Sequence, residues 1–183
     1  GVPIKEFSLK DLRGRIGIVP QRAVLFRGSI RENLQWGKEF ITGEEIEKAL
    51  RISQSKEFVE ELPNGIDSII SQDGKNLSGG QRQRLTRARA IAMNPQILIL
   101  DDSASALDYA TEAKLRKASR SECKNMTVII VSQRANSIKH ADKILVLDNG
   151  KLVGLGSHGE LLESCQVYKE ICLSQFKDEE VYA

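Results

Sequence analysis

The chain lacks the features that mark membrane-spanning, secreted and nucleic-acid-coating proteins. Its 183 residues contain no apolar run that approaches the ~20 residues of a membrane span. No signal-peptide pattern opens the sequence. The net charge of +2 gives no strong general attraction to nucleic acid or to anionic lipid. We therefore expect any membrane role to run through a partner, or through a part of the protein outside these residues.

Cysteine is also scarce, with one residue at each of positions 123, 165 and 172. The number is odd, and the spacings match neither a zinc site nor a redox CxxC motif. We predict reduced, mostly buried thiols in a cytosolic protein. The apolar share of 40% and the charged share of 28% are typical of a soluble globular protein, and the length suffices for one compact domain.

What the chain does contain is an alternation of helices with short, uninterrupted apolar strands. This alternation predicts an α/β fold built on a parallel sheet. Ser29 with Glu32, and Ser157 with Glu160, have the spacing of helix capping boxes. The predicted strands are 15–19, 96–102 and 126–133, with a hairpin at 142–156, and the predicted helices are 29–36, 43–53, about 78–93, 111–119 and one or two within 157–176.

Residues 76–90 read NLSGGQRQRLTRARA, and a helix is predicted to begin at Ser78. The first N–H groups of a helix have no intrahelical partner, and the helix dipole adds partial positive charge there. Gly79 and Gly80 allow an anion to approach the backbone closely, and Ser78 adds a hydroxyl donor. The pattern indicates a phosphate-binding helix end. The alternative is an ordinary helix capped by serine.

The same helix carries four arginines. At 100° per residue, Arg82 and Arg89 share one face while Arg84 and Arg87 share another, roughly 150° away. The four side chains do not form a single stripe, which disfavours nucleic-acid binding. We predict a solvated or salt-bridged helix instead.

A second candidate site follows the apolar strand at 96–102, which ends in Asp101 and Asp102. In open α/β sheets, ligands bind at the carboxyl ends of the strands. Asp101 is placed to hold Mg²⁺ through water, and Asp102 is placed to orient or deprotonate an attacking water. The alternative is that both acids cap a following helix.

Four motifs occur in the order typical of one family, namely VPQ (19–21), LSGGQ (77–81), ILILDD (97–102) and SALD (105–108). Together they resemble the Q-loop, the signature, the Walker B strand and the D-loop of the ABC-transporter ATPase domain. LFRGSIRENL (25–34) and ADKILVLDNGKLVGLGSHGELL (141–162) are similar to the exporter subgroup, which includes multidrug exporters.

The resemblance implies a RecA-like P-loop NTPase core with an inserted helical signature subdomain, incomplete at the N-terminus. The helical subdomain would cover about 28–92, and the core about 1–27 and 93–176. The tail 177–183 is expected to be frayed.

The family also implies partners and roles. Two such domains pair head to tail around two ATP molecules with Mg²⁺. Gln21 would reach the Mg²⁺ and the attacking water, Asp101 would hold the Mg²⁺ through water, and Asp108 would communicate between the two sites. The signature would cap the γ-phosphate of ATP held by the partner domain, through Ser78, Gly79, Gly80 and Gln81.

A P-loop, GxxGxGK[ST], is absent from these 183 residues. The family places it before the Q-loop, so we expect it upstream of Gly1, in a longer protein. Its strand would lie beside the strand that ends at Gln133. A transmembrane domain, fused upstream or separate, would be the second partner, at the cytoplasmic face of the plasma membrane.

Two residues depart from the family pattern. The family usually has Glu where Asp102 stands and His where Gln133 stands. Both departures fall on the site built with this chain's own P-loop, whereas the signature serving the partner is intact. This predicts an asymmetric, heterodimeric exporter with one degenerate site. The alternative is a homodimer that tolerates Asp and Gln.

Three rival functions share parts of the pattern. A DNA-repair or chromosome-organising ATPase would carry long coiled coils, but no sustained heptads occur, and no nucleic-acid partner is expected. A ribosome-associated relative usually carries two domains in one chain. A catalytically inert module that caps a partner's nucleotide is the third alternative.

Overall fold

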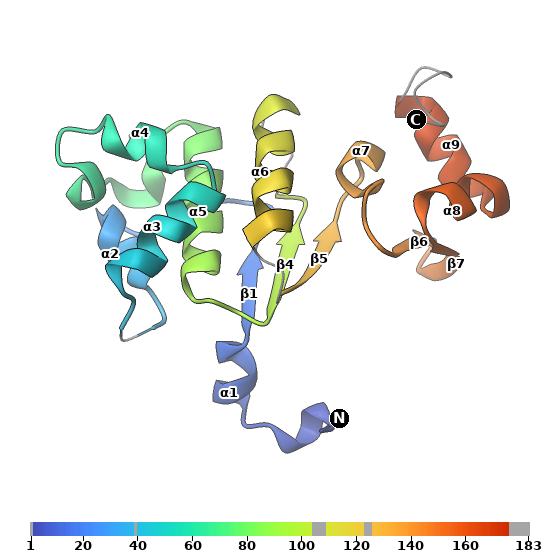
Figure 1. Ribbon diagram of the computed structural model, residues 1–183, viewed down its shortest axis with the longest axis horizontal. Helices are drawn as coiled ribbons and strands as arrows, with labels where there is room; N and C mark the ends of the chain where they lie inside the picture. The colour runs from blue at the N-terminus through green and yellow to red at the C-terminus, as the bar shows by residue number, and fades with distance from the viewer. Residues whose placement is uncertain (1, 39, 104–108, 123–125, 176–183) are drawn as a thin grey trace. The chain divides into compact units, whose positions relative to one another are not determined.

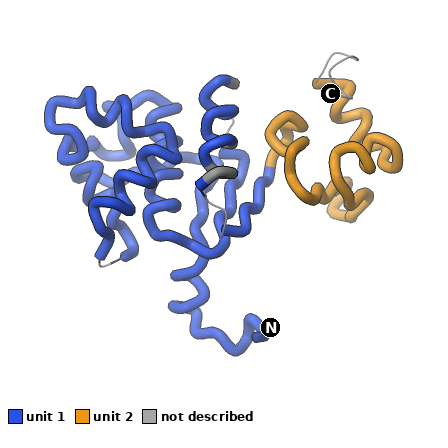
Figure 2. The backbone as a smooth tube through the Cα atoms, viewed as in Figure 1, with its two compact units in different colours: residues 1–131 blue, residues 132–183 orange. Residues whose placement is uncertain are grey.

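The computed structural model describes residues 2–38, 40–103, 109–122 and 126–175. The backbone divides into two compact units, Gly1–Val131 and Ser132–Ala183 (Figure 2). Among the described helices, none is both long and apolar enough to cross a bilayer. The predicted frayed tail and Cys123 lie outside the described residues.

A three-stranded parallel sheet forms the centre of the first unit (Figure 1). Its strands are β1 (Ile16–Val19), β4 (Ile97–Asp101) and β5 (Thr127–Val131), in the order β1-β4-β5. The register places Val19 of β1 beside Leu100 of β4, and Asp101 beside Val131 of β5. The parallel α/β sheet predicted from the sequence is therefore confirmed, and the carboxyl ends of all three strands share one edge.

Helix α5 (Gly79–Ala92) packs against β1 and also against α2 (Ile30–Gln35) and α3 (Gly43–Ile52). One continuous core runs from the sheet through α5 into these helices, and it includes Leu98, Leu85 and Leu34. The other elements of this unit are η1 (Ile4–Glu6), α1 (Leu9–Gly14), β2 (Gly28–Ser29), α4 (Lys56–Glu60), η2 (Gly65–Asp67), β3 (Ile69–Ile70), η3 (Gln72–Gly74) and α6 (Tyr109–Glu122).

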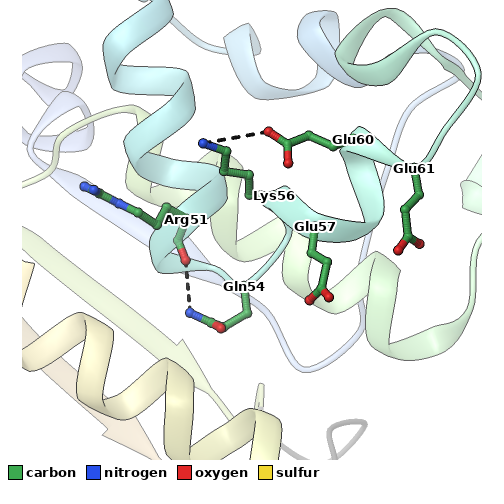
Figure 3. A pocket seen from close by; sticks show the side chains of 6 residues that line it. All are labelled: Arg51, Gln54, Lys56, Glu57, Glu60 and Glu61. Atoms are coloured by element: carbon green, nitrogen blue, oxygen red, sulfur yellow. Dashed lines mark hydrogen bonds and ion pairs between the residues drawn. The ribbon is translucent and has the colours of Figure 1, made fainter.

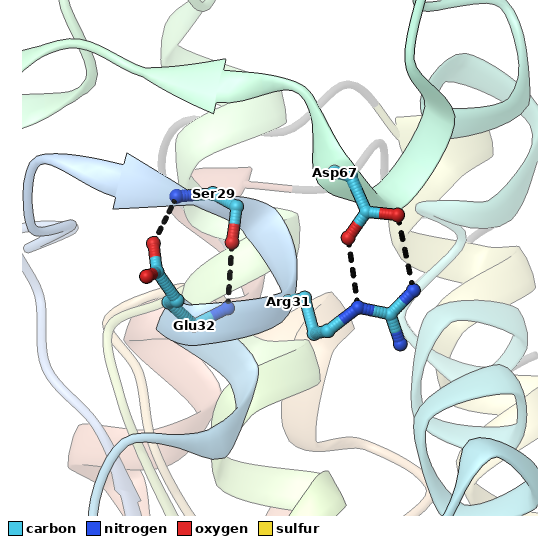
Figure 4. A network of polar contacts seen from close by, with 4 residues as sticks. All are labelled: Ser29, Arg31, Glu32 and Asp67. Carbon is cyan, nitrogen blue, oxygen red and sulfur yellow. Dashed lines mark hydrogen bonds and ion pairs between the residues drawn. The ribbon is translucent and has the colours of Figure 1, made fainter.

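The predicted capping box at Ser29 is present (Figure 4). Its side chain accepts the backbone N–H of Glu32 at 3.1 Å, and the Glu32 carboxylate accepts the N–H of Ser29. Arg31, which lies between these two residues in the sequence, forms a bidentate ion pair with Asp67, with N–O distances of 2.8 and 3.2 Å. Both side chains are well exposed, so this pair orients the η2 turn against α2 more than it stabilises the fold.

The second unit begins with α7 (Ala135–Ile138) and continues into an antiparallel hairpin, β6 (Ile144–Asp148) and β7 (Lys151–Gly156). Its turn residues, Asn149 and Gly150, have φ values of 47° and 74°, as the favoured two-residue hairpin turn requires. Helices α8 (His158–Ser164) and α9 (Gln166–Gln175) follow. The predicted hairpin, the Ser157 capping box and the buried, reduced state of Cys165 and Cys172 are all confirmed.

One expectation about burial is wrong. The strand at 126–133 was predicted to be buried, yet Ile129 and Val131 of β5 are 47% and 52% exposed. They share a sheet face with Ile18 of β1, which is 58% exposed. The reason is that β5 is the edge strand of the three-stranded sheet, and no described element of the first unit fully covers that face.

This open apolar face predicts that the isolated 183-residue chain self-associates at micromolar concentration, because exposed strand edges and apolar patches drive aggregation. Replacing Ile129 with lysine should raise the monomer fraction measured by light scattering. Gln72→Lys, which adds the same charge on an exposed loop, should not. A clean cooperative melt of a monomeric wild-type chain would contradict the expectation.

Candidate functional site

The predicted phosphate-binding tip lies at the start of α5. Ser78 is the N-cap, and its side chain accepts the N–H of Gln81 at 3.2 Å. The Gln81 side-chain oxygen accepts the N–H of Ser78 at 2.8 Å, which completes a capping box. The N–H groups of Gly79 and Gly80, at the first two helical positions, have no partner within the helix. The helix can therefore keep its serine cap while the N–H groups of Gly79 and Gly80 stay available to donate hydrogen bonds to a ligand.

Among the described residues, no close contact requires a glycine at position 79. A Cβ built there would come within 4 Å of a single described group, the end of the flexible Arg82 side chain, at 4.0 Å. Its φ also lies outside the left-handed region that favours glycine. The missing side chain leaves an exposed helix end open to close approach from outside. An anion bound to the backbone N–H groups requires such an opening.

The second candidate site lies at the carboxyl end of β4. Asp101 is the last residue of the strand and is exposed. Asp102 follows with a φ of 41°, an uncommon conformation for a residue other than glycine, and its N–H donates to the Val131 carbonyl at 2.8 Å. Strained backbone of this kind concentrates at functional sites. The turn separates the two carboxylates at the sheet edge.

The sheet brings Gln21 to the same place. The side-chain N–H of Gln21 donates to a carboxylate oxygen of Asp102 at a long 3.5 Å. The two residues lie 81 positions apart in the sequence. They meet because Val19 and Leu100, two residues before each, are neighbours in the parallel ladder. An amide and a carboxylate at the carboxyl ends of adjacent strands can bind a metal ion or a water molecule.

The structure does not bring all the predicted residues together. Among the described residues, no hydrogen bond joins Ser78, Gly79 or Gly80 to Gln21 or to the two carboxylates. Gln133 opens the second unit, where its side chain is exposed and its carbonyl accepts a hydrogen bond from Gln175 at 2.8 Å. Asp108 and the rest of the SALD motif lie outside the described residues.

The prediction of a solvated helix is wrong, whereas its salt-bridged alternative is not contradicted, because the charge of Glu112 acts on the Arg87 guanidinium. Residues on several sides of α5 are buried, because the sheet and helices α2 and α3 pack around it. Its arginines donate hydrogen bonds into the protein, and burial lowers the pKa of two guanidinium groups, Arg89 and Arg87. The acceptors are the Leu77 carbonyl for Arg82, the Gln54 carbonyl for Arg84, the Ser103 hydroxyl for Arg87 and the Val24 carbonyl for Arg89.

An open hollow between the end of α3 and α4 is separate from these residues (Figure 3). It is walled by charged and amide side chains, with an ion pair between Lys56 and Glu60. None of the predicted nucleotide-binding residues lines it; the lining residues are Arg51, Gln54, Lys56, Glu57, Glu60 and Glu61. The hollow therefore plays no part in the candidate site.

A comparison with known families decides to which family the chain belongs. Residues 1–105, more than half of the chain, match the family model described as ABC transporter. The chain belongs to the ABC transporter family. The matched range contains both the tip of α5 and the strand that carries Asp101.

Curated relatives place the chain among ATP-binding proteins of this family. It is 47% identical over 175 residues to the ABC transporter ATP-binding protein YfiB of Bacillus subtilis, covering 95% of this chain and 30% of that protein. It is 40% identical over 178 residues to the ATP-dependent lipid A-core flippase of Chromobacterium violaceum, covering 97% of this chain and 30% of the flippase. The chain therefore spans about 30% of the length of these relatives.

A solved structure confirms the fold. A bacterial Atm1-family ABC exporter with ATP bound superimposes with a TM-score of 0.88 at 36% identity. The match covers 94% of this chain and 30% of the exporter chain. The fold is that of an ABC exporter's nucleotide-binding domain.

Sequence reasoning missed three polar residues beside the candidate site. Gln83 donates to the Pro20 carbonyl at 3.3 Å, and Arg87 donates to the Ser103 hydroxyl at 3.0 Å. A usable signal was present, since residues 83 and 87 are four apart and so share one helix face. The number of arginines indicates only that the helix is charged, whereas the four-residue spacing indicates that Gln83 and Arg87 share a face.

The absence of a P-loop motif from these residues predicts that the isolated chain binds ATP very weakly and hydrolyses none. Cradling the phosphates requires the glycine-rich backbone and lysine of that loop. Isothermal titration calorimetry with Mg-ATP should show no binding in the micromolar range. The complete protein, titrated in parallel, is the positive control, and micromolar binding by the isolated chain would overturn the expectation.

Proposed function

We propose that this chain is the signature-bearing part of the ATPase domain of an ABC exporter, in which ATP-driven pairing of two such domains powers export across a membrane. The observation that carries the proposal is the exposed, serine-capped tip of α5, which lies within the residues that match the ABC transporter family model. The relatives favour an exporter over a DNA-repair, chromosome-organising or ribosome-associated ATPase, because they include a flippase and an exporter structure.

In the proposed assembly the tip serves a nucleotide on a second ATPase domain. The N–H groups of Gly79 and Gly80, with the hydroxyl of Ser78, would bind the γ-phosphate of ATP seated on the partner's P-loop. Gln81 would hold the tip in shape through its capping hydrogen bonds.

The chain's own site would form around the edge of the sheet. Asp101, through water, and Gln21 would hold Mg²⁺ there, and the ion would neutralise phosphate charge. Asp102 would orient the attacking water and take its proton as the water oxygen attacks the γ-phosphorus and ADP departs. Gln133 would hydrogen-bond the γ-phosphate, and Asp108 would communicate with the partner's site.

The proposed partners and boundaries follow from the same arrangement. Residues of about 28–92 would form the helical subdomain that presents the signature, and about 1–27 and 93–176 the ATP-binding core. A transmembrane domain, fused or separate, would hold this pair of domains at the cytoplasmic face of the plasma membrane.

We infer further that the two sites differ in rate. Asp102 is one methylene shorter than the glutamate typical of the family, about 1.5 Å of reach, and misplacement of that order can lower a rate ~100-fold. A neutral glutamine at position 133 can donate a hydrogen bond but cannot carry a proton or a positive charge. Such a pair of departures supports a heterodimer whose other site performs most of the turnover. The alternative is a homodimer with modest activity.

The asymmetry predicts that restoring glutamate and histidine, as Asp102→Glu with Gln133→His, raises steady-state ATPase turnover of the complete exporter severalfold. The longer carboxylate regains its reach, and the imidazole can carry a proton. ATP hydrolysis is measured in detergent or nanodiscs, with each single variant alongside. Unchanged turnover in a folded complex would refute the degenerate-site hypothesis and favour the homodimer.

The signature role predicts that Ser78→Arg abolishes most ATPase activity of the complete exporter, because a bulky side chain blocks the tip against the partner's phosphate. Ser157→Arg is a matched control: Ser157 is the N-cap of α8 and has the same capping-box bonds. Both variants lose an N-cap, at a cost of ~1 kcal/mol of stability. If both lower activity equally, the effect is one of folding, and the signature role is not supported.

A further inference from the structure

Two polar side chains on α5 lie inside the first unit rather than at its surface. Gln83 and Arg87 are 2% and 5% exposed, and they lie one turn apart on one helix face. Polar side chains this well buried are uncommon unless their hydrogen bonds have a specific role. Neither belongs to any of the four motifs.

Each of the two contacts a neighbour of a proposed site residue. The Gln83 amide donates to the carbonyl of Pro20, which directly precedes Gln21. The Arg87 guanidinium donates to the hydroxyl of Ser103, which directly follows Asp102 and is itself buried. One helix face therefore holds both of the loops whose side chains meet in the hydrogen bond between Gln21 and Asp102.

Burying the charged guanidinium of Arg87 costs desolvation free energy, which argues that its contact with Ser103 does more than fill space. Burial lowers the pKa of its guanidinium to about 10, while the buried carboxylate of Glu112 on α6 partly offsets this. The group still carries its positive charge at neutral pH. Its Nε has no hydrogen-bond partner among the described residues. An apolar side chain would fill the same space without desolvating a charge.

We propose that Arg87, with Gln83, is a positioning residue that holds the catalytic carboxylate Asp102 and its partner Gln21 in place. Asp102 has a φ of 41° and is held on one side by its own N–H bond to the Val131 carbonyl. The Arg87–Ser103 bond holds the other side of this strained turn. Without it, the turn can relax and the carboxylate moves away from the position of the attacking water.

The contacts of Gln83 and Arg87 also connect the signature tip of α5 to the turn that holds Asp102. Helix α5 is 14 residues long, begins at the signature tip and carries Arg87 near its middle. A shift of the tip as it closes on the partner's phosphate would be transmitted along this helix to Ser103 and Asp102. This step rests on the proposed function, whereas the positioning of Asp102 within the chain does not.

The test uses the complete exporter carrying Ser78→Arg, because that change blocks the partner's site and leaves this chain's own site as the source of the measured turnover. Arg87→Met, Ser103→Ala and the double variant are each added to this parent. Misplacement of a catalytic group lowers the rate of the chemical step more than it lowers substrate binding. Arg87→Met should lower kcat on the order of 10-fold with KM for ATP within twofold, and Ser103→Ala should act in the same direction. Because both remove one contact, the double variant should be no slower than Arg87→Met alone.

Arg84→Met is the matched control. Arg84 lies on the same helix and also donates a hydrogen bond into the protein, but its acceptor is the Gln54 carbonyl and its guanidinium lies over the Phe58 ring. Its kcat should stay within twofold of that of the Ser78→Arg parent. A folded Arg87→Met variant with the kcat of this parent, or an unchanged kcat in Ser103→Ala while Arg87→Met is slow, would overturn the proposal. No turnover by the wild type would instead contradict the proposed function.

A second measurement does not depend on turnover. Hydrogen–deuterium exchange of the complete exporter should be at least tenfold faster at the Asp102 and Ser103 amides in Ser103→Ala and Arg87→Met than in the wild type. It should be unchanged at these amides in Arg84→Met. Equal protection of this turn in all variants would show that Arg87 does not hold it, whatever the ATPase rates.

Discussion

The burial of α5 is the constraint on which the rest of the first unit depends. The helix packs against β1 on one side and against α2 and α3 on others, so one core joins the sheet to the helical layer. Four arginines on a buried helix would be most costly if their guanidinium groups found no acceptor at all. Each is instead aimed at an acceptor contributed by a different segment, so the helix organises the loops around it. The segments are those of Leu77, Gln54, Ser103 and Val24.

The candidate catalytic site depends on sheet register rather than on sequence proximity. Parallel pairing of β1 with β4 sets Val19 beside Leu100, and two residues later Gln21 meets Asp102. Pairing of β4 with β5 continues to the Asp102 N–H, which donates to Val131. A one-residue slip in either ladder would turn these side chains to the other face of the sheet. The positions of Gln21 and Asp102 are therefore fixed by the register of the β1–β4 and β4–β5 ladders.

Much of this could be predicted from the sequence because it is encoded locally. Uninterrupted apolar runs predicted the strands, the spacing of Ser29 with Glu32 predicted a cap, and Asn149-Gly150 predicted the hairpin. The exposure of Ile129 could not be predicted, because it depends on which neighbours cover a strand. The burial of Arg87 escaped for a similar reason, since charge and periodicity describe one helix and say nothing about how many sides of it are packed. The Gln21–Asp102 contact needed the register of two strands 81 residues apart, although the family motifs had placed both residues in one site.

The division of labour within the chain explains why a helix should connect its two sites. The signature tip lies at the exposed start of α5, whereas the carboxylates lie at the end of β4. They are nevertheless joined by a single rigid element, since Ser78 caps the helix on which Gln83 and Arg87 lie. An arrangement that separates the groups chemically while coupling them mechanically suits an assembly in which each nucleotide is shared by two domains. In the proposed assembly, closing on a neighbour's phosphate at the tip would change the geometry of the chain's own carboxylate through the helix backbone and its buried hydrogen bonds.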